Sequence, residues 1–397
     1  MEKTTVFEAC LSRRDVGLNG TYAELTLPAT YYELQDALDK ARLEDGADVC
    51  IEITNYSRFP FLEPFLEDEN NIYELNALAA KLAALEPWKA DALEGLVIME
   101  GQKDELISLP CLYDLAASAG ECQVLYNVRS DAELGGFYAL NGFLPELEGL
   151  SDAVYELLDE EKIGSKMRQD DGGVFLHYGS GYVTLVGNMK EEFKTLDMTP
   201  RKPDYTVLLE VGVPDTDDSV MLGLPCEREA LNDVLTRLKA GGWSVLTWRC
   251  ADCRIPALCD AFSMTDNILF ANSAARQLSE LSGDALLEYR ALAEVFKIND
   301  LNTAVEFMER MDDYAFSPEY DAPETVARKE LEYSMGKSEA QLAMPFVDLR
   351  GYGQKLMKEQ NQAMTSYGVL CRRDGQPIQT MTERDQTTTC EMEMRQM

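Results

Sequence analysis

The sequence predicts an α+β fold in which small α/β subdomains form an elongated chain of two tandem repeats. Short segments with alternating apolar and polar residues are followed by segments whose apolar residues recur at helical spacing. The second half of the chain repeats motifs of the first half in the same order. The 397 residues exceed one ordinary domain, and 46% are hydrophobic, which is enough for packed cores.

The chain is predicted to begin with a small sheet and one helix. Residues 5–11 and 21–27 alternate like half-buried strands. Residues 31–41 have helical spacing, and residues 49–53 resemble a third strand. These four segments predict a first α/β subdomain.

A cluster of helices is predicted next. Asn71 can cap a helix, with Glu74 three positions later. The apolar face of that helix holds Ile72, Leu75, Ala79 and Leu82. Pro87 stands where the next helix, 88–99, would begin, and residues 109–118 form a third helix before Gly120.

A smaller mixed region is predicted to close the first repeat. Residues 123–128 read as a strand, and Ser151 can cap a helix over 152–163. Residues 174–178 and 182–186 form a predicted hairpin around YGSG.

Three pairs of motifs carry the internal repetition. YAELTLPATYYELQDAL (22–38) corresponds to VMLGLPCEREALNDVL (220–235), 197 positions later. NIYELNALAAKLAAL (71–85) shares six identical residues in fifteen with NILFANSAARQLSEL (267–281). Near the end of each repeat Tyr178-Gly179 corresponds to Tyr367-Gly368. We therefore expect repeat one at 1–190, a linker at 191–203, repeat two at 204–375 and a polar, flexible tail at 376–397.

The charge balance limits the possible partners. The chain has 71 Asp and Glu against 36 Lys and Arg, a net charge of −35. Such a surface repels nucleic acid and anionic lipid, so basic proteins or basic clefts are the expected partners. A role in solubility alone is the competing interpretation. The sequence shows no leader and no apolar run of membrane-spanning length, and its ten cysteines are scattered, so we expect a cytoplasmic protein with reduced thiols.

Motifs of catalysis and metal binding are sparse. The one histidine, His177, lies in VFLHYG, where a partly buried strand residue is expected rather than a base. We find no Walker loop, H-E-x-x-H or dinucleotide-binding motif. Cys250, Cys253 and Cys259 in CADCRIPALC lack a second thiol pair, so we expect core residues rather than a zinc site. The sequence predicts a binding protein without catalysis, cofactor or metal; bound zinc or a divalent-dependent activity would instead indicate an enzyme.

Two segments concentrate acids without any Lys or Arg. Residues 59–80 hold the first group: Glu63, Glu67, Asp68, Glu69 and Glu74. Residues 130–161 hold the second group: Asp131, Glu133, Glu146, Glu148, Asp152, Glu156, Asp159, Glu160 and Glu161. Ordinary solvated helix faces interleave both signs, because like charges at i,i+4 are unfavourable. These fourteen acids are the candidate contact residues, and a solvated loop that favours a helix start is the alternative for the acids at 67–69.

The second segment predicts a charged helix face. Asp152, Glu156 and Glu160 would stack at i,i+4, about 6 Å apart. The net charge equals that of about 17 base pairs at two phosphates each. Residues 1–200 carry −23 and residues 201–397 carry −12, so repeat one is the better candidate for the main contact.

The succession of motifs resembles the ArdA-type antirestriction proteins of conjugative elements. The likeness rests on LTLPATYYELQDAL, VCIEITNY and IYELNALAAKLAAL in repeat one, and on APETVARKELEYSMG, FVDLRGYGQKLM and TSYGVL in repeat two. The resemblance implies a slender acidic DNA mimic that occupies the DNA-binding groove of type I restriction-modification enzymes. Family members are about one repeat long and pair as dimers, so this chain would be a monomeric pseudo-dimer or a homodimer. It assigns no single essential residue, because mimicry is spread over many carboxylates.

An acidic scaffold or chaperone for a basic protein of the same mobile element is the alternative function. Recovery of such a protein without any restriction subunit would favour it.

Overall fold

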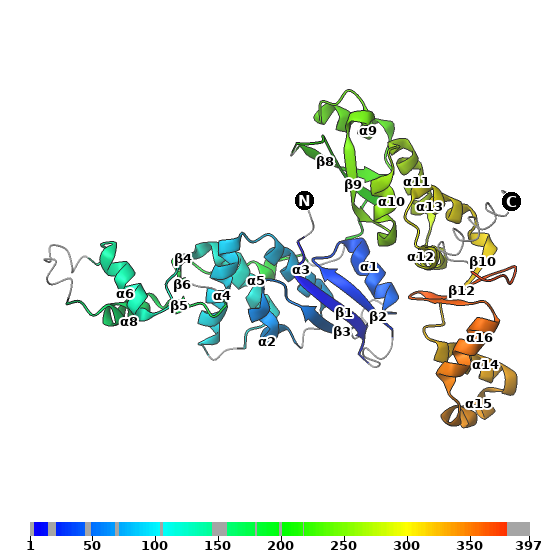
Figure 1. Ribbon diagram of the computed structural model, residues 1–397, viewed down its shortest axis with the longest axis horizontal. Coiled ribbons are helices and arrows are strands. Elements are labelled where there is room, and N and C mark those ends of the chain that lie inside the picture. Colours follow the sequence, from blue (N-terminus) through cyan, green and yellow to red (C-terminus); the bar gives the residue numbers. More distant parts are fainter. Residues whose placement is uncertain are drawn as a thin grey trace, which may run out of the picture. The chain divides into compact units, whose positions relative to one another are not determined.

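The computed structural model describes residues 4–14, 21–43, 49–67, 71–103, 106–144, 157–178, 181–197, 201–216 and 218–378 (Figure 1). The chain forms two compact units. Compact unit 1 consists of Met1–Cys10, Glu24–Pro28 and Val49–Pro200, and compact unit 2 consists of Leu11–Ala23, Ala29–Asp48 and Arg201–Met397. Because this grouping follows spatial contacts, it places residues 29–43, part of repeat one by sequence, with repeat two.

Repeat one contains strands, α-helices and short 3-10 turns (η). In chain order these are β1 (Phe7–Arg13), β2 (Tyr22–Leu27), α1 (Tyr31–Lys40), β3 (Val49–Asn55), η2 (Pro60–Leu62), α2 (Glu63–Leu66), α3 (Ile72–Ala83), α4 (Pro87–Gly101), α5 (Leu109–Ser118), η3 (Ala119–Glu121), β4 (Cys122–Tyr126), α6 (Asp131–Leu140), α8 (Glu160–Asp171), β5 (Val174–Phe175) and β6 (Gly181–Leu185). A further turn, η5 (Phe193–Thr195), follows.

Repeat two presents a similar succession. Its elements are β7 (Val207–Gly212), β8 (Ser219–Leu224), α9 (Arg228–Arg237), η6 (Trp243–Val245), β9 (Thr247–Cys253), η7 (Pro256–Leu258), α10 (Cys259–Met264), α11 (Ile268–Glu280), α12 (Asp284–Phe296), α13 (Leu301–Glu309), η8 (Met311–Asp313), β10 (Tyr314–Ser317), α14 (Pro323–Met335), α15 (Lys337–Ala343), η9 (Met344–Phe346), α16 (Leu349–Glu359), β11 (Ala363–Thr365) and β12 (Gly368–Arg372). Of these, η6, α15 and η9 have no counterpart among the described elements of repeat one.

The sheets confirm the α+β class and have the same strand order in both repeats. The first sheet of each repeat has the order β2-β1-β3 or β8-β7-β9, and the second has β4-β6-β5 or β10-β12-β11. The peptide bonds before Pro28 and Pro225 are both cis. The side chains of Asn71 and Asn267 cap α3 and α11 in the same way, each accepting from two backbone amides. The two halves are therefore two copies of one α+β arrangement.

The predicted strands and helices of the first subdomain and the helical cluster are confirmed. Strands β1, β2 and β3 and helix α1 lie where the alternation and helical spacing placed them. The whole predicted face of α3 is buried. Helix α4 begins at Pro87, and α5 has the predicted bounds 109–118.

Predictions for the mixed end of repeat one were partly wrong. Residues 157–159 are not helical, so the predicted uninterrupted helix over 152–163 is not formed. Asp152 and Glu156, two members of the predicted i,i+4 stack, lie outside the described residues. The physical reason is Asp159, whose Oδ1 accepts the Lys162 amide hydrogen at 3.1 Å and starts α8 at Glu160. Helix α6 was not predicted, because its Gly135-Gly136 pair is unfavourable for an isolated helix.

His177 is exposed, whereas the alternation had predicted a partly buried strand residue. Strand β5 is short and ends at Phe175. The buried carboxylate of Glu94 accepts the backbone amides of His177 and Tyr178 at 2.6 and 2.7 Å. This takes both amides out of the strand ladder and turns the chain.

Close backbone contact joins α6 and α8, which lie side by side in Figure 1. A Cβ added at Gly164 would lie 1.7 Å from the Asp131 carbonyl oxygen, and one at Gly135 would lie 1.8 Å from the Glu160 carbonyl oxygen. Gly353 of α16 has the same place in repeat two, where an added Cβ would lie 1.9 Å from the Pro323 carbonyl oxygen of α14. Both helix pairs therefore need glycine at the crossing.

A buried charge network holds α1 within compact unit 2. Arg290 of α12 is 3% exposed, and its Nε lies 3.3 Å from Asp36 Oδ1. Its Nη1 also pairs with Asp39. Asp36 accepts a hydrogen bond from the Tyr367 hydroxyl at 2.8 Å and pairs with Lys40 at 2.8 Å. Each charge in this interior thus has a partner, as burial requires.

Candidate partner-binding surface

The solvent face of the first sheet carries three carboxylates, Glu8, Glu24 and Glu52, which we call the acidic sheet face. Along β1 the side chains alternate, so Phe7 is buried and Glu8 is exposed. Glu24 on β2 and Glu52 on β3 are exposed as well. Burial, and then the charges of Glu24 and Glu52, raise the pKa of the Cys10 thiol on the central strand. Cys10 therefore lies near both of these carboxylates.

The strand geometry sets the spacing of these charges. Neighbouring strands lie about 4.8 Å apart, so the outer strands that carry Glu24 and Glu52 are about 10 Å apart. Glu8 lies two residues from Cys10, about 7 Å along the strand. Two unit charges at about 10 Å in water repel by about 0.4 kcal/mol, so this arrangement is mildly unfavourable.

The corresponding face of repeat two is locally neutral. Met221 and Arg249, 197 positions after Glu24 and Glu52, flank Glu210 on the central strand. Arg249 donates to Glu210 Oε2 at 2.7 Å, and Ser219 donates to Oε1 at 3.1 Å. These hydrogen bonds, that of Arg249 foremost, lower the pKa of Glu210. The same sheet therefore forms without a row of unpaired acids, and the acidic sheet face is not a requirement of the fold.

Of the first predicted group of acids, Glu63 and Glu67 are exposed, at the start and just beyond the end of α2. Burial, and then these two charges, raise the pKa of Tyr56. No ion pair joins either of them to another residue that the structure describes. Glu74 instead serves its own helix, since its Oε1 accepts from Asn71 Nδ2 at 2.7 Å. Asp68 and Glu69 lie outside the described residues.

In the second group, three described acids have structural partners. Asp131 forms two hydrogen bonds with Arg168, at 2.8 and 2.9 Å, which lower the pKa of Asp131. Glu133 accepts the Arg129 amide at 2.6 Å and so closes the cap of α6. Asp159 caps α8 and pairs with Lys162 at 2.9 Å. Their charge is thus partly used within the protein.

Glu160 and Glu161 are the exposed acids of the first turn of α8. Within the described ranges neither has an ion-pair partner, and the helix N-terminus favours negative charge there. Glu160 lies over Gly136, where an added Cβ would be 3.4 Å from the carboxylate. Glu146, Glu148, Asp152 and Glu156 lie outside the described residues. The predicted segment therefore supplies two unpaired carboxylates beside its three partnered ones.

The acidic sheet face was missed as a site by sequence reasoning. That reasoning searched for runs without Lys or Arg, but a strand presents every second residue, so neighbouring acids on a sheet come from separate segments. Glu24 in YAELTL and Glu52 in VCIEIT stand at polar positions of alternating strands. This alternation is the signal that could have found them.

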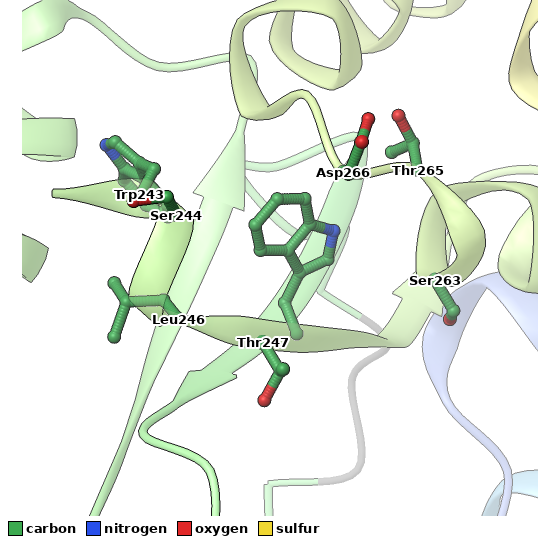
Figure 2. A pocket seen from close by; sticks show the side chains of 8 residues that line it. Trp243, Ser244, Leu246, Thr247, Ser263, Thr265 and Asp266 are labelled. Carbon is green, nitrogen blue, oxygen red and sulfur yellow. The ribbon is translucent and has the colours of Figure 1, made fainter.

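Two of the pockets formed by described residues lie in compact unit 2. One, of about 240 Å³, is lined by Trp243, Ser244, Leu246, Thr247, Trp248, Ser263, Thr265 and Asp266 (Figure 2). The two tryptophan rings meet edge to face at 6.0 Å. The other, of about 610 Å³, lies between α9 and α11, where Arg276 approaches Glu227 at 3.5 Å. Asp266 is the one ionisable residue among those that line the first pocket, so acid–base chemistry there would lack a second group.

Cys250 and Cys259 are half-buried and Cys253 is fully buried in the core of compact unit 2, as predicted for core residues. Among the described residues no group of three or more His, Cys, Asp or Glu side chains is arranged to hold a metal ion.

None of the described helices combines the length and apolar character needed to cross a bilayer. No protein-family model matches the chain, and no curated protein matches it either.

Proposed function

We propose that this protein is an antirestriction DNA mimic, which occupies the cationic DNA-binding groove of a type I restriction-modification enzyme. The net charge of −35 and the sequence resemblance to ArdA-type proteins support this function. So do the exposed carboxylates of compact unit 1. In this proposal the protein is a cytoplasmic inhibitor without catalysis or cofactor, and carboxylates take the place of DNA phosphates. The second repeat takes the place of the second subunit of a dimer.

The acidic sheet face is the observation that carries the proposal. Repeat two shows that the sheet can be built with Met221, Glu210 and Arg249 and with no local excess of charge. Repeat one places acids on the same surface at a small electrostatic cost, so their benefit lies outside folding. Binding to a cationic groove would supply that benefit, because phosphate-binding grooves hold several Lys and Arg side chains.

The remaining exposed acids of compact unit 1 add to the same charge. Glu63 and Glu67 at α2, and Glu160 and Glu161 at α8, are unpaired within the described part of the chain. A cationic partner could approach them without first breaking an ion pair. Delocalised binding of this kind predicts graded losses when single acids are replaced.

A plasmid restriction assay in cells with a type I system tests the proposal. The test variant is Glu24→Met with Glu52→Arg, which gives repeat one the residues that repeat two has at the corresponding positions, 221 and 249. It raises the net charge by three. The matched control is Glu280→Met with Glu309→Arg, which changes the charge equally at exposed acids of compact unit 2. We expect the test variant to lose most protection and the control to keep it. Equal protection by both variants would contradict the role of the acidic sheet face.

A further inference from the structure

Three cysteine thiols meet where β9 passes into α10 in compact unit 2. Cys250 pairs with Leu209 and Cys253 with Val207, while Ala251 between them has no partner and forms a bulge. Residues three apart in a regular strand point to opposite faces, but the bulge places Cys250 and Cys253 on the same face. Cys259, the first residue of α10, packs against the same core.

The three thiols influence one another's ionisation, and the Cys250 thiol also donates to the Asp252 carbonyl oxygen at 3.3 Å. Hydrogen bonds from Cys250 and Cys253 lower the pKa of the Cys259 thiol, and burial raises that of Cys253. A lowered pKa favours the thiolate, the nucleophilic form of cysteine. Cys259 is half-buried, so a small reagent can reach it more readily than the fully buried Cys253.

Ser263 ties the backbones of Cys250 and Cys259 together. Its hydroxyl oxygen accepts the Cys250 amide hydrogen at 2.8 Å and donates to the Cys259 carbonyl oxygen at 2.8 Å. Ser263 also lines the 240 Å³ pocket in Figure 2. Of the possible pairs, Cys250 and Cys259 are thus the two that combine backbone proximity with partial exposure.

Repeat one shows that the fold does not require these thiols. At the offset of 197 that relates Arg249 to Glu52, Cys250 and Cys253 correspond to Ile53 and Tyr56. At the offset of 196 that relates Asn267 to Asn71, Cys259 corresponds to Glu63. The same strand, turn and helix form there as β3, η2 and α2. The thiol cluster is therefore a property of repeat two that folding leaves unexplained.

We propose that Cys259 and Cys250 form an oxidant-responsive pair, which hydrogen peroxide or a small organic hydroperoxide converts to a disulfide. The Cys259 thiolate attacks the terminal peroxide oxygen and the O–O bond breaks. The departing hydroxide takes a proton to leave as water, or, from an organic hydroperoxide, the departing alkoxide takes a proton to leave as an alcohol. The Cys250 sulfur then attacks the Cys259 sulfenic acid, the S–O bond breaks, and water leaves with the Cys250 proton. Two thiols lose two electrons in total, and one peroxide gains them. This inference does not depend on the proposed antirestriction function.

Peptide mapping of the full-length protein tests the pair directly. The reduced protein is treated with equimolar hydrogen peroxide, its remaining thiols are alkylated, and it is digested with trypsin without reduction. Cleavage after Arg249, Arg254 and Arg276 leaves CADCR separate from the peptide 255–276, which contains Cys259. A disulfide from Cys259 to either Cys250 or Cys253 therefore joins two peptides, whereas one between Cys250 and Cys253 stays within CADCR.

We expect the joined peptides to appear roughly tenfold or more faster than Cys226, a half-buried thiol of the same unit, is oxidised. Cys259→Ser should abolish the joined species, while Cys253→Ser and the matched control Cys226→Ser should retain it. An internal disulfide in CADCR as the main product, or oxidation of Cys259 no faster than that of Cys226, would overturn the proposal. Fragmentation of the joined wild-type peptides in the mass spectrometer shows whether Cys250 or Cys253 carries the bond, and this decides the question even where a variant folds poorly.

Discussion

Replacement of Arg290 by Met should destabilise compact unit 2 strongly. The guanidinium side chain is 2% exposed and pairs with Asp36 and Asp39, and its Nη2 donates to the Arg254 carbonyl oxygen at 3.1 Å. Removal of one partner of a buried ion pair costs about 3–5 kcal/mol, because the other charge stays buried. Lys40 remains 2.8 Å from Asp36, so we expect the lower end, about 3 kcal/mol.

Thermal unfolding followed by circular dichroism measures this effect. A unit of this size loses about 2–4 °C per kcal/mol, so the melting temperature of Arg290→Met should fall by about 6–12 °C. The matched control is Arg310→Met, because Arg310 pairs with Glu306 and Asp313 with its side chain 39% exposed. That variant should lose no more than about 1 kcal/mol.

A second substitution separates charge from packing. Burial, although opposed by Arg290, raises the pKa of Asp39 in the folded protein. Asp39→Asn added to Arg290→Met should therefore recover part of the lost stability, since it removes a carboxylate left without its partner. If Arg290→Met unfolds at the same temperature as Arg310→Met, the reasoning about this network is refuted.

Three further outcomes follow from compact unit 1. Gly164→Ala should destabilise the α6–α8 pair by about 1–3 kcal/mol, seen as faster amide hydrogen exchange in both helices. At Gly101 an added Cβ would make an ordinary contact with Ile107 Cδ1 at 3.9 Å, so Gly101→Ala should be neutral or slightly stabilising. Arg168 lowers the pKa of Asp131. Because the pair is partly exposed, it stabilises the fold by under about 1 kcal/mol. This stabilisation is present above the ordinary carboxyl pKa and is lost as pH falls through the lowered pKa. Hydrogen exchange of the two helices in wild type and Asp131→Asn should therefore differ more at pH 7 than at pH 3. Glu94→Ala should cost about 2–4 kcal/mol in urea unfolding, because two backbone amides of the turn before β6 lose their buried acceptor, and an unchanged midpoint would contradict this.

Local signals predicted most of the fold. The alternation in β1 and β2, the Asn71 cap of α3 and the proline at the start of α4 act within a few residues, so the sequence reveals them without tertiary context. The same local reasoning failed at α6, where Gly135 is unfavourable for a helix by itself. It is favourable once α8 crosses at backbone contact, which is a tertiary effect.

The candidate site was less accessible to sequence reasoning. The run of acids at 130–161 read as one charged surface, but Asp131 and Asp159 pair with cations that lie later in the chain. Glu24 and Glu52 were not predicted as site residues, because each is the single acid of its strand and only sheet pairing brings them to one face. Charge in sequence therefore indicated the kind of surface, while the residues of that surface depend on pairing across the sheet.

Competition with duplex DNA for a purified type I methyltransferase core tests the central claim most directly. A labelled duplex with the recognition site is displaced by the wild-type protein, and the affinity is measured at about 50 and 200 mM salt. We expect full displacement by the wild type, steep weakening with salt, and about tenfold weaker displacement by Glu24→Met with Glu52→Arg. Binding that leaves the duplex in place, or an affinity that is the same at both salt concentrations, would contradict the claim that this protein binds in the place of DNA.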